Sequence, residues 1–423
     1  MGRPQTAPAE AELPASEPPA GALPEAGLLP AELRGAERSA VKRSEAELRE
    51  ATLSEAALRD ATRPAAECPA AEREAAQPES VHEVPPAPAR SPYIVGPVYD
   101  WAFFLLPPVL ALGLGIAISG TAFSDTPVRF FGQEKTWAGL LVGSLIHAHL
   151  VAVLFRSHGN PAIFRLYPLR FVLVPVLAWA AIRGSAVVAV AATVLATFWD
   201  VWHSGLQTFG LARIYDRNRG NPPVTGRRLD FWLNHLLYAG PILAGAAMLD
   251  HFDSFASFDA VGMTWLASVP ARMTATHALW TRGVLAVGGA FLVLYVAASV
   301  RLLKRGHRPS FHKVFLLVTT GACSIYTWGF NSWGEAFFIM NLLHAVQYLA
   351  LVWAMEGDRL RKRLRLKWRS VALVLFLGTV FAYGLGAELL DPDLESLWAF
   401  TLVVSLMHFW YDGFIWSVAR RQV

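Results

Sequence analysis

The stretch EAFFIMNLLHAVQYLALVWAME, residues 335–356, decides the fold of this chain. A helix of about 20 predominantly apolar residues is long enough to cross a membrane. The polar side chains Asn341, His344, Gln347 and Tyr348 recur within this stretch at the spacing of one helical face. Because polar groups are expensive in hydrocarbon, this face is predicted to point into a bundle of helices and to mark a functional site.

The composition of the whole chain agrees with an integral membrane protein. Hydrophobic residues make up 54% of the 423 residues and charged residues only 17%. The net charge is +4, and the basic residues lie in loops between apolar segments, so nucleic acid is not expected as a partner. The two cysteines, Cys68 and Cys323, cannot build a disulfide framework, a thiolate zinc site or an iron–sulfur cluster.

The sequence divides into two parts. Residues 1–92 are rich in Ala, Glu and Pro and are predicted to be a disordered cytoplasmic tail, which could dock a protein partner. Residues 93–423 are predicted to form an all-α, polytopic membrane bundle of about ten transmembrane helices. The apolar segments are 98–120, 137–156, 168–183, 185–208, 229–250, 278–302, 312–330, 335–356, 370–390 and 397–418. The short segment 168–183 is either a full span or a re-entrant piece.

The charges of the loops alternate along the chain. The loops after every second segment are basic, as in RLRKRLRLKWR at 359–369, whereas the alternate loops carry acidic residues such as Asp250 and Glu395. The positive-inside rule therefore places both termini in the cytoplasm and favours an even number of spans. We expect the protein in a membrane, most simply the inner membrane of a bacterium.

Five of the segments carry histidine, and two of these add a carboxylate about one helical turn away. The candidate metal ligands are His147, His149, His203, His235, His344, His408, Asp200 and Asp412. With a rise of about 1.5 Å per residue, His344 and His408 are predicted to lie level with His147 and His149 near the midplane. His203 and His235 are predicted to form a second layer nearer the cytoplasm.

Helical spacing predicts which of these side chains share a face. Asp200 and His203 are three residues apart, and His408 and Asp412 are four apart, so each pair lies on one side of its helix. The two histidines of HAH, residues 147–149, point about 200° apart, so only one of them is expected to face the bundle centre.

The residue types favour a metal site. Neutral imidazole binds iron, copper or zinc, and carboxylates serve as ligands or as acceptors that fix the imidazole tautomer. A donor set of nitrogen and oxygen without thiolate suits non-haem iron, haem iron or copper better than a structural zinc. A polar packing network without metal, and a path for protons or substrate, are the alternatives.

Two short windows resemble a known group of membrane enzymes. The His-then-carboxylate spacing near the C-terminus and the segment LLHAVQYLALVW resemble the Brp/Blh-like carotene-cleaving oxygenases, which hold non-haem iron with histidines on several helices. The desaturase and hydroxylase class is more distant, because its HxxxH and HxxHH boxes do not occur here. The resemblance implies iron ligands at His203, His344 and His408. Where that group has a second histidine one turn later, this chain has Gln347 and Tyr348.

The leading functional hypothesis is a metal-dependent oxidoreductase or oxygenase that acts on a hydrophobic small molecule taken from membrane lipid. The alternatives are a b-type haem electron-transfer subunit, a proton-coupled transporter, and a structural or assembly subunit that binds its partner through the tail.

Overall fold

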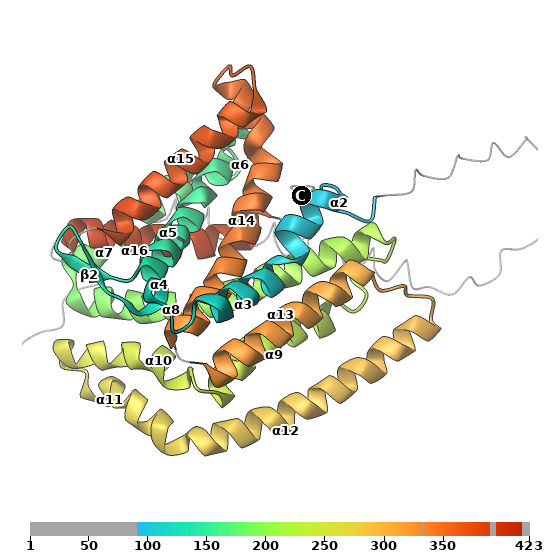
Figure 1. Cartoon of the computed structure of the whole chain (residues 1–423), viewed down its shortest axis with the longest axis horizontal. Coiled ribbons are helices and arrows are strands. Elements are labelled where there is room, and N and C mark those ends of the chain that lie inside the picture. Colours follow the sequence, from blue (N-terminus) through green and yellow to red (C-terminus); the bar gives the residue numbers. More distant parts are fainter. Residues whose placement is uncertain (1–90, 332, 390–394, 417–423) are drawn as a thin grey trace, which may run out of the picture. The chain divides into compact units, whose positions relative to one another are not determined.

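The structure, a computed structural model, describes residues 91–331, 333–389 and 395–416 (Figure 1). Almost all of the predicted N-terminal tail, and Cys68 within it, lie outside these residues. The described chain is helical apart from one short antiparallel hairpin, in which Val128 pairs with Lys135. This confirms the predicted helical class.

The elements follow one another closely along the chain. Their bounds are α2 Pro97–Asp100, the π-helical turn η1 Trp101–Leu105, α3 Pro107–Ile118, α4 Ala122–Asp125, β1 Val128–Phe130, β2 Gln133–Lys135, α5 Trp137–Ser157, α6 Pro161–Phe164, α7 Pro168–Gly184, α8 Ala186–Asn218, α9 Arg227–Ala244, α10 Met248–Asp253, the 3-10 helix η2 Ser254–Val261, α11 Thr264–Ala267, α12 Val269–Lys304, α13 Phe311–Phe330, α14 Trp333–Arg363, α15 Arg369–Glu388 and α16 Glu395–Ile415.

Each predicted apolar segment is helical, but the predicted count of about ten transmembrane helices is not confirmed. Within the described residues, 5 helices are long and apolar enough to cross a membrane, or 6 if the pair around Leu106, bent by 48°, is one span. Helix α7 has 17 residues and contains Pro175, so it is shorter than a typical span of about 20. Its helix is nevertheless continuous, and it meets α8 at Ser185.

Helix α8 is longer than the sequence predicted. It continues from the apolar segment that ends at residue 208 to Asn218 without a break, and so it includes the charged residues Arg213 and Asp216. A span needs only about 20 residues, so the 33 residues of α8 carry its charged end beyond the apolar part of the bundle.

Helices α5 and α9 pack mainly against different sets of helices. Helix α5 contacts α14, α15 and α16, whereas α9 contacts α8, α12 and α13 (Figure 1). The approach of α15 to α5 is especially close at Gly384, where an added Cβ would lie 2.1 Å from the carbonyl oxygen of Ser144. Small residues at helix contacts let membrane helices approach backbone to backbone.

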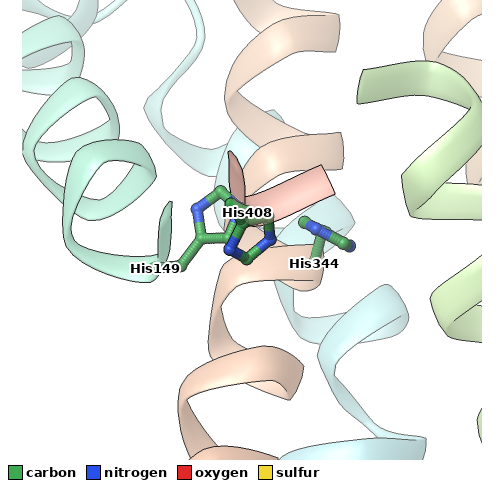
Figure 2. A group of neighbouring side chains, drawn as sticks. All are labelled: His149, His344 and His408. Carbon is green, nitrogen blue, oxygen red and sulfur yellow. The ribbon is translucent and has the colours of Figure 1, made fainter. Parts of the chain in front are cut away.

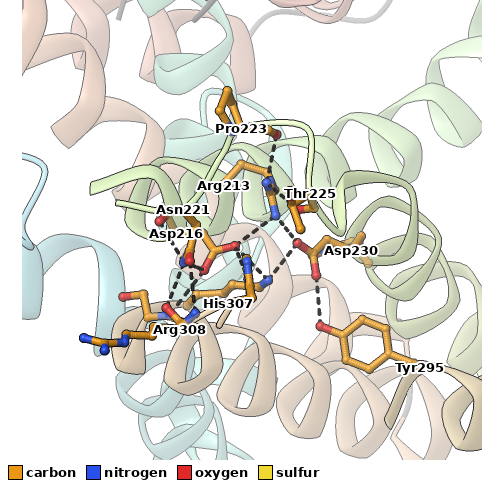
Figure 3. A network of polar contacts seen from close by, with 12 residues as sticks. Arg213, Asp216, Asn221, Pro223, Thr225, Asp230, Tyr295, His307 and Arg308 are labelled. Atoms are coloured by element: carbon orange, nitrogen blue, oxygen red, sulfur yellow. Dashed lines mark hydrogen bonds and ion pairs between the residues drawn. The ribbon is translucent and has the colours of Figure 1, made fainter. Parts of the chain in front are cut away.

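A buried ion network joins α8, α9 and α13 at the charged end of α8 (Figure 3). Asp216 and Asp230 are both buried, and Arg213 and Lys313 each bridge the two carboxylates. The Lys313 Nζ lies 2.8 Å from Asp230 and 3.3 Å from Asp216. The Tyr295 hydroxyl of α12 donates a 2.9 Å hydrogen bond to Asp230. Buried charges of this kind are stable only when they are paired, so the network fixes how these helices meet.

Candidate metal centre

Four helices that are far apart in the sequence each contribute one histidine to a single point. His149 lies on α5, His203 on α8, His344 on α14 and His408 on α16. Their exposed fractions are 0%, 4%, 1% and 0%. Figure 2 shows the rings of His149, His344 and His408 turned toward one another. We call these residues the four-histidine cluster.

The rings are close enough to share one ligand. The centroids of neighbouring rings are 4.7 to 5.1 Å apart, from His203–His408 as the shortest pair to His203–His344 as the longest. One ring nitrogen from each of His149, His344 and His408 lies within 4.8 Å of the other two. Donors that bind an ion at about 2.1 Å lie about 3 to 4 Å from one another. Small side-chain movements would therefore bring the nitrogens to coordination distance.

Hydrogen bonds orient His408 toward the cluster. Its Nδ1 lies 3.1 Å from the carbonyl oxygen of Leu150, and a carbonyl can only accept, so Nδ1 carries the proton. Its Nε2 is then unprotonated and faces the Nε2 of His203 at 3.0 Å. A backbone acceptor that fixes the tautomer in this way is typical of metal-binding histidine.

The ring nitrogens of His149 and His344 are left without partners. Among the described residues, all four of these nitrogens are buried and none has a hydrogen-bond partner of normal geometry. Buried polar groups in native proteins are nearly always hydrogen-bonded, because desolvation without a bond costs about 1–3 kcal/mol for each group. An imidazole binds an ion through one of its nitrogens, so a bound metal ion would give one nitrogen of each ring a partner.

Asp412 lies at the edge of the cluster. Its Oδ2 is 3.7 Å from the Nε2 of His203 and 3.9 Å from that of His408, so the three residues form a second group of close donors. The Tyr348 hydroxyl and the Trp416 indole N–H each donate a 2.8 Å hydrogen bond to Oδ1. These two donors hold the carboxylate in place and leave Oδ2 directed at the histidines.

A buried ion pair lies just beyond Asp412. The guanidinium of Arg156 lies over the Trp416 ring at 4.5 Å and pairs with Glu356 at 2.6 Å. Asn160 also donates to Glu356, at 3.1 Å. This chain of contacts extends the polar surroundings of the cluster toward the ends of α5 and α14.

Three of the predicted ligands are not brought into the cluster. His147 lies on the opposite face of α5 from His149, as their spacing predicted, and its Nε2 is 3.8 Å from Glu388. His235 bonds through Nδ1 to the carbonyl of Phe231 at 2.8 Å, and its ring packs on Trp202 at 3.9 Å. Asp200 lines a separate cavity.

The predicted layers are also corrected. The ring of His203 lies 4.7 Å from that of His408 and 5.1 Å from that of His344, so His203 belongs to the same layer as these histidines. The depth estimate assumed that every helix starts at the same height. His203 lies farther from the start of its helix than the other three histidines do, so α8 begins farther from the cluster than α5, α14 and α16.

Two cavities flank the four-histidine cluster. The larger, of about 320 Å³, is lined by the residue three positions before each histidine, namely Ile146, Asp200, Asn341 and Ser405. The smaller, of about 130 Å³, is lined by Gln207, Tyr348 and Asp412, each four positions after a histidine. The four helices therefore run in the same direction through the cluster, which agrees with the alternation of loop charges.

His251 also lines the larger cavity, from the short helix α10. Burial lowers the pKa of this imidazole, although its hydrogen bond to the Ala247 carbonyl and the nearby Asp250 favour the charged form. A neutral imidazole therefore borders the cavity near pH 7. Sequence reasoning assigned no role to this residue, because it lies outside the apolar segments.

The chain has no recognisable relative in the comparisons with known proteins. No protein family, no curated protein and no solved structure matches it.

Proposed function

We propose that the chain is a membrane metalloenzyme in which His149, His203, His344 and His408 hold one transition-metal ion. The proposed metal is non-haem iron, and the proposed activity is that of an oxidoreductase or oxygenase acting on a lipid-soluble substrate. The observation that carries the proposal is the convergence of four buried imidazoles from four helices, with the ring nitrogens of two of them unpartnered.

The donor set supports iron. Imidazole and carboxylate ligands suit iron, copper or zinc, and Cys323, the one cysteine within the described residues, lies on α13, outside the cluster. The close spacing of the rings favours a single ion over haem, because rings 4.7 to 5.1 Å apart leave no slot for a macrocycle between them. Copper and zinc are alternative outcomes of the same measurement.

The residues around the cluster have distinct roles in this proposal. The Leu150 carbonyl holds the His408 tautomer, and Tyr348 and Trp416 hold Asp412 as an acceptor or a further ligand. A bound iron would supply oxygen activation and electron transfer. The apolar walls of the bundle would exclude water and admit the substrate from the bilayer.

The membrane and its orientation are part of the proposal. Several helices long enough to span a bilayer, together with the alternation of basic and acidic loops, support a bacterial inner-membrane protein with both termini in the cytoplasm.

Elemental analysis with a visible spectrum tests the proposal. The protein purified from iron-replete cells is expected to contain about one equivalent of iron and no Soret band. His344→Gln is expected to lose the metal, whereas the matched control His235→Gln is expected to retain it. If the unaltered protein contains no transition metal above trace amounts, the metal centre is refuted. A Soret band would instead show that the protein binds haem.

A further inference from the structure

The smaller cavity touches the four-histidine cluster directly. It runs along α8 from His203 to Ile214, a distance of about 16 Å at the rise of an α-helix. Helices α14 and α16 form its other walls, through residues such as Leu351 and Phe409. Within the described residues, no histidine of the cluster lines the larger cavity.

The lining of this cavity has two distinct regions. The polar groups of the lining come from His203, Gln207, Tyr348 and Asp412. His203 belongs to the cluster, Asp412 lies 3.7 Å from it, and Tyr348 donates a hydrogen bond to Asp412. The remaining wall is apolar. It consists mainly of Leu206, Leu211, Ile214, Leu351 and Phe409. Such a pocket matches a ligand that is hydrocarbon along its length and reacts at one end or at one bond.

Two glycines leave the pocket open between α8 and α16. Gly210 is half-buried and Gly413 is exposed, and both line the cavity. A Cβ added to either residue would meet no atom within 4 Å, so there is space beside both glycines. The apolar segment of α8 ends at residue 208, so an opening beside Gly210 lies at the cytoplasmic edge of this span, where lipid acyl chains meet their headgroups.

We propose that the smaller cavity is the substrate pocket, and that the hydrocarbon chain of the substrate enters it sideways from the bilayer between α8 and α16, past Gly210 and Gly413. This inference rests on the proposed function. The enclosed space of about 130 Å³ is close to that of a cavity that binds benzene, about 150 Å³. The pocket therefore encloses only the reacting part of the chain, and the remainder extends into lipid.

Photo-crosslinking tests this entry route. The full-length protein is placed in phosphatidylcholine nanodiscs with palmitic acid that carries a diazirine in mid-chain and a terminal alkyne, and labelled peptides are mapped by mass spectrometry. We expect label on residues 203–214 and 409–416. Gly210→Leu and Gly413→Leu, singly and together, place a side chain in the open space and are expected to reduce this label severalfold. Gly386→Leu on α15 is the matched control, because this glycine is also exposed and also has no neighbour within 4 Å.

The outcomes separate this inference from the proposed function. Label on other lipid-facing helices alone, or label that both glycine variants leave unchanged, overturns the entry route. Metal content is measured on the same samples. A metal-free protein that is labelled in the pocket refutes the metal centre but retains the pocket, whereas a metal-loaded protein without label there refutes the pocket alone. Leucine is a better helix former than glycine, and size-exclusion chromatography confirms that each variant remains folded.

Discussion

The contact between α5 and α15 gives a sharp test of how the cluster is supported. In Gly384→Ala, the new Cβ would lie 2.1 Å from the Ser144 carbonyl oxygen and 3.0 Å from the amide nitrogen of Ala148. Carbon and oxygen normally approach to about 3.3 Å, so the two helices must part by about 1 Å. Overpacking of this kind costs about 1–3 kcal/mol of folding free energy.

The displaced turn of α5 carries a proposed ligand. Ala148 is adjacent to His149, so a shift of α5 changes the position of this imidazole relative to His344 and His408. A misplacement of about 1 Å in an active site can reduce the reaction rate about a hundredfold, and a displaced metal ligand likewise binds its ion less tightly. We therefore expect Gly384→Ala to lose stability and metal together.

The assay measures thermal unfolding in detergent and the metal retained after dialysis against a chelator. Gly378→Ala on the same helix is the control, because its Cβ would meet nothing within 4 Å and it gains the same helix propensity. Gly384→Ala is expected to unfold at lower temperature than this control and to release its metal more easily. Equal unfolding temperatures and equal metal retention in the two variants would refute the close approach of α5 and α15.

Three further predictions concern the four-histidine cluster and the buried ion network. Asp412→Asn keeps the hydrogen bonds at Oδ1 but removes the charge beside the histidines, so metal affinity measured by competition with a chelator should fall about 10- to 100-fold; unchanged affinity would make Asp412 a packing residue. His344→Gln should abolish stoichiometric metal in elemental analysis, and a fully loaded variant would remove His344 from the ligand set. Asp216→Asn leaves Lys313 with Asp230 as its remaining ion-pair partner among the described residues, so the unfolding free energy should fall by about 3–5 kcal/mol; a loss below about 1 kcal/mol in denaturant titration would show that the pair is hydrated.

Some of this arrangement was predictable from the sequence because it follows from helical geometry alone. The spacing of His147 and His149 predicted that one of them faces away, and the structure places His147 beside Glu388. The four-residue spacing of His408 and Asp412 likewise predicted that their side chains share a face. These predictions depend on rotation about a single helix, which the residue numbers determine.

Other predictions failed where they depended on how whole helices are placed. The depth of His235 suggested a ligand, but its helix turns the imidazole to Trp202 and to the Phe231 carbonyl. Asp200 shares a helical face with His203 but lies one turn before it, in the larger cavity. The Leu150 carbonyl could not be predicted as a partner of His408, because every backbone carbonyl looks alike in a sequence.

The order of the four helices along the chain has a consequence for biosynthesis. Of the four histidines, His149 is translated first and His408 last, because α16 follows all the other described helices. His408 belongs to both groups of close donors, so neither group exists until α16 has left the ribosome and joined the nascent bundle. In the proposed metal centre, ion capture would therefore be a late event in maturation, and a polypeptide stalled before α16 would hold only three of the four imidazoles.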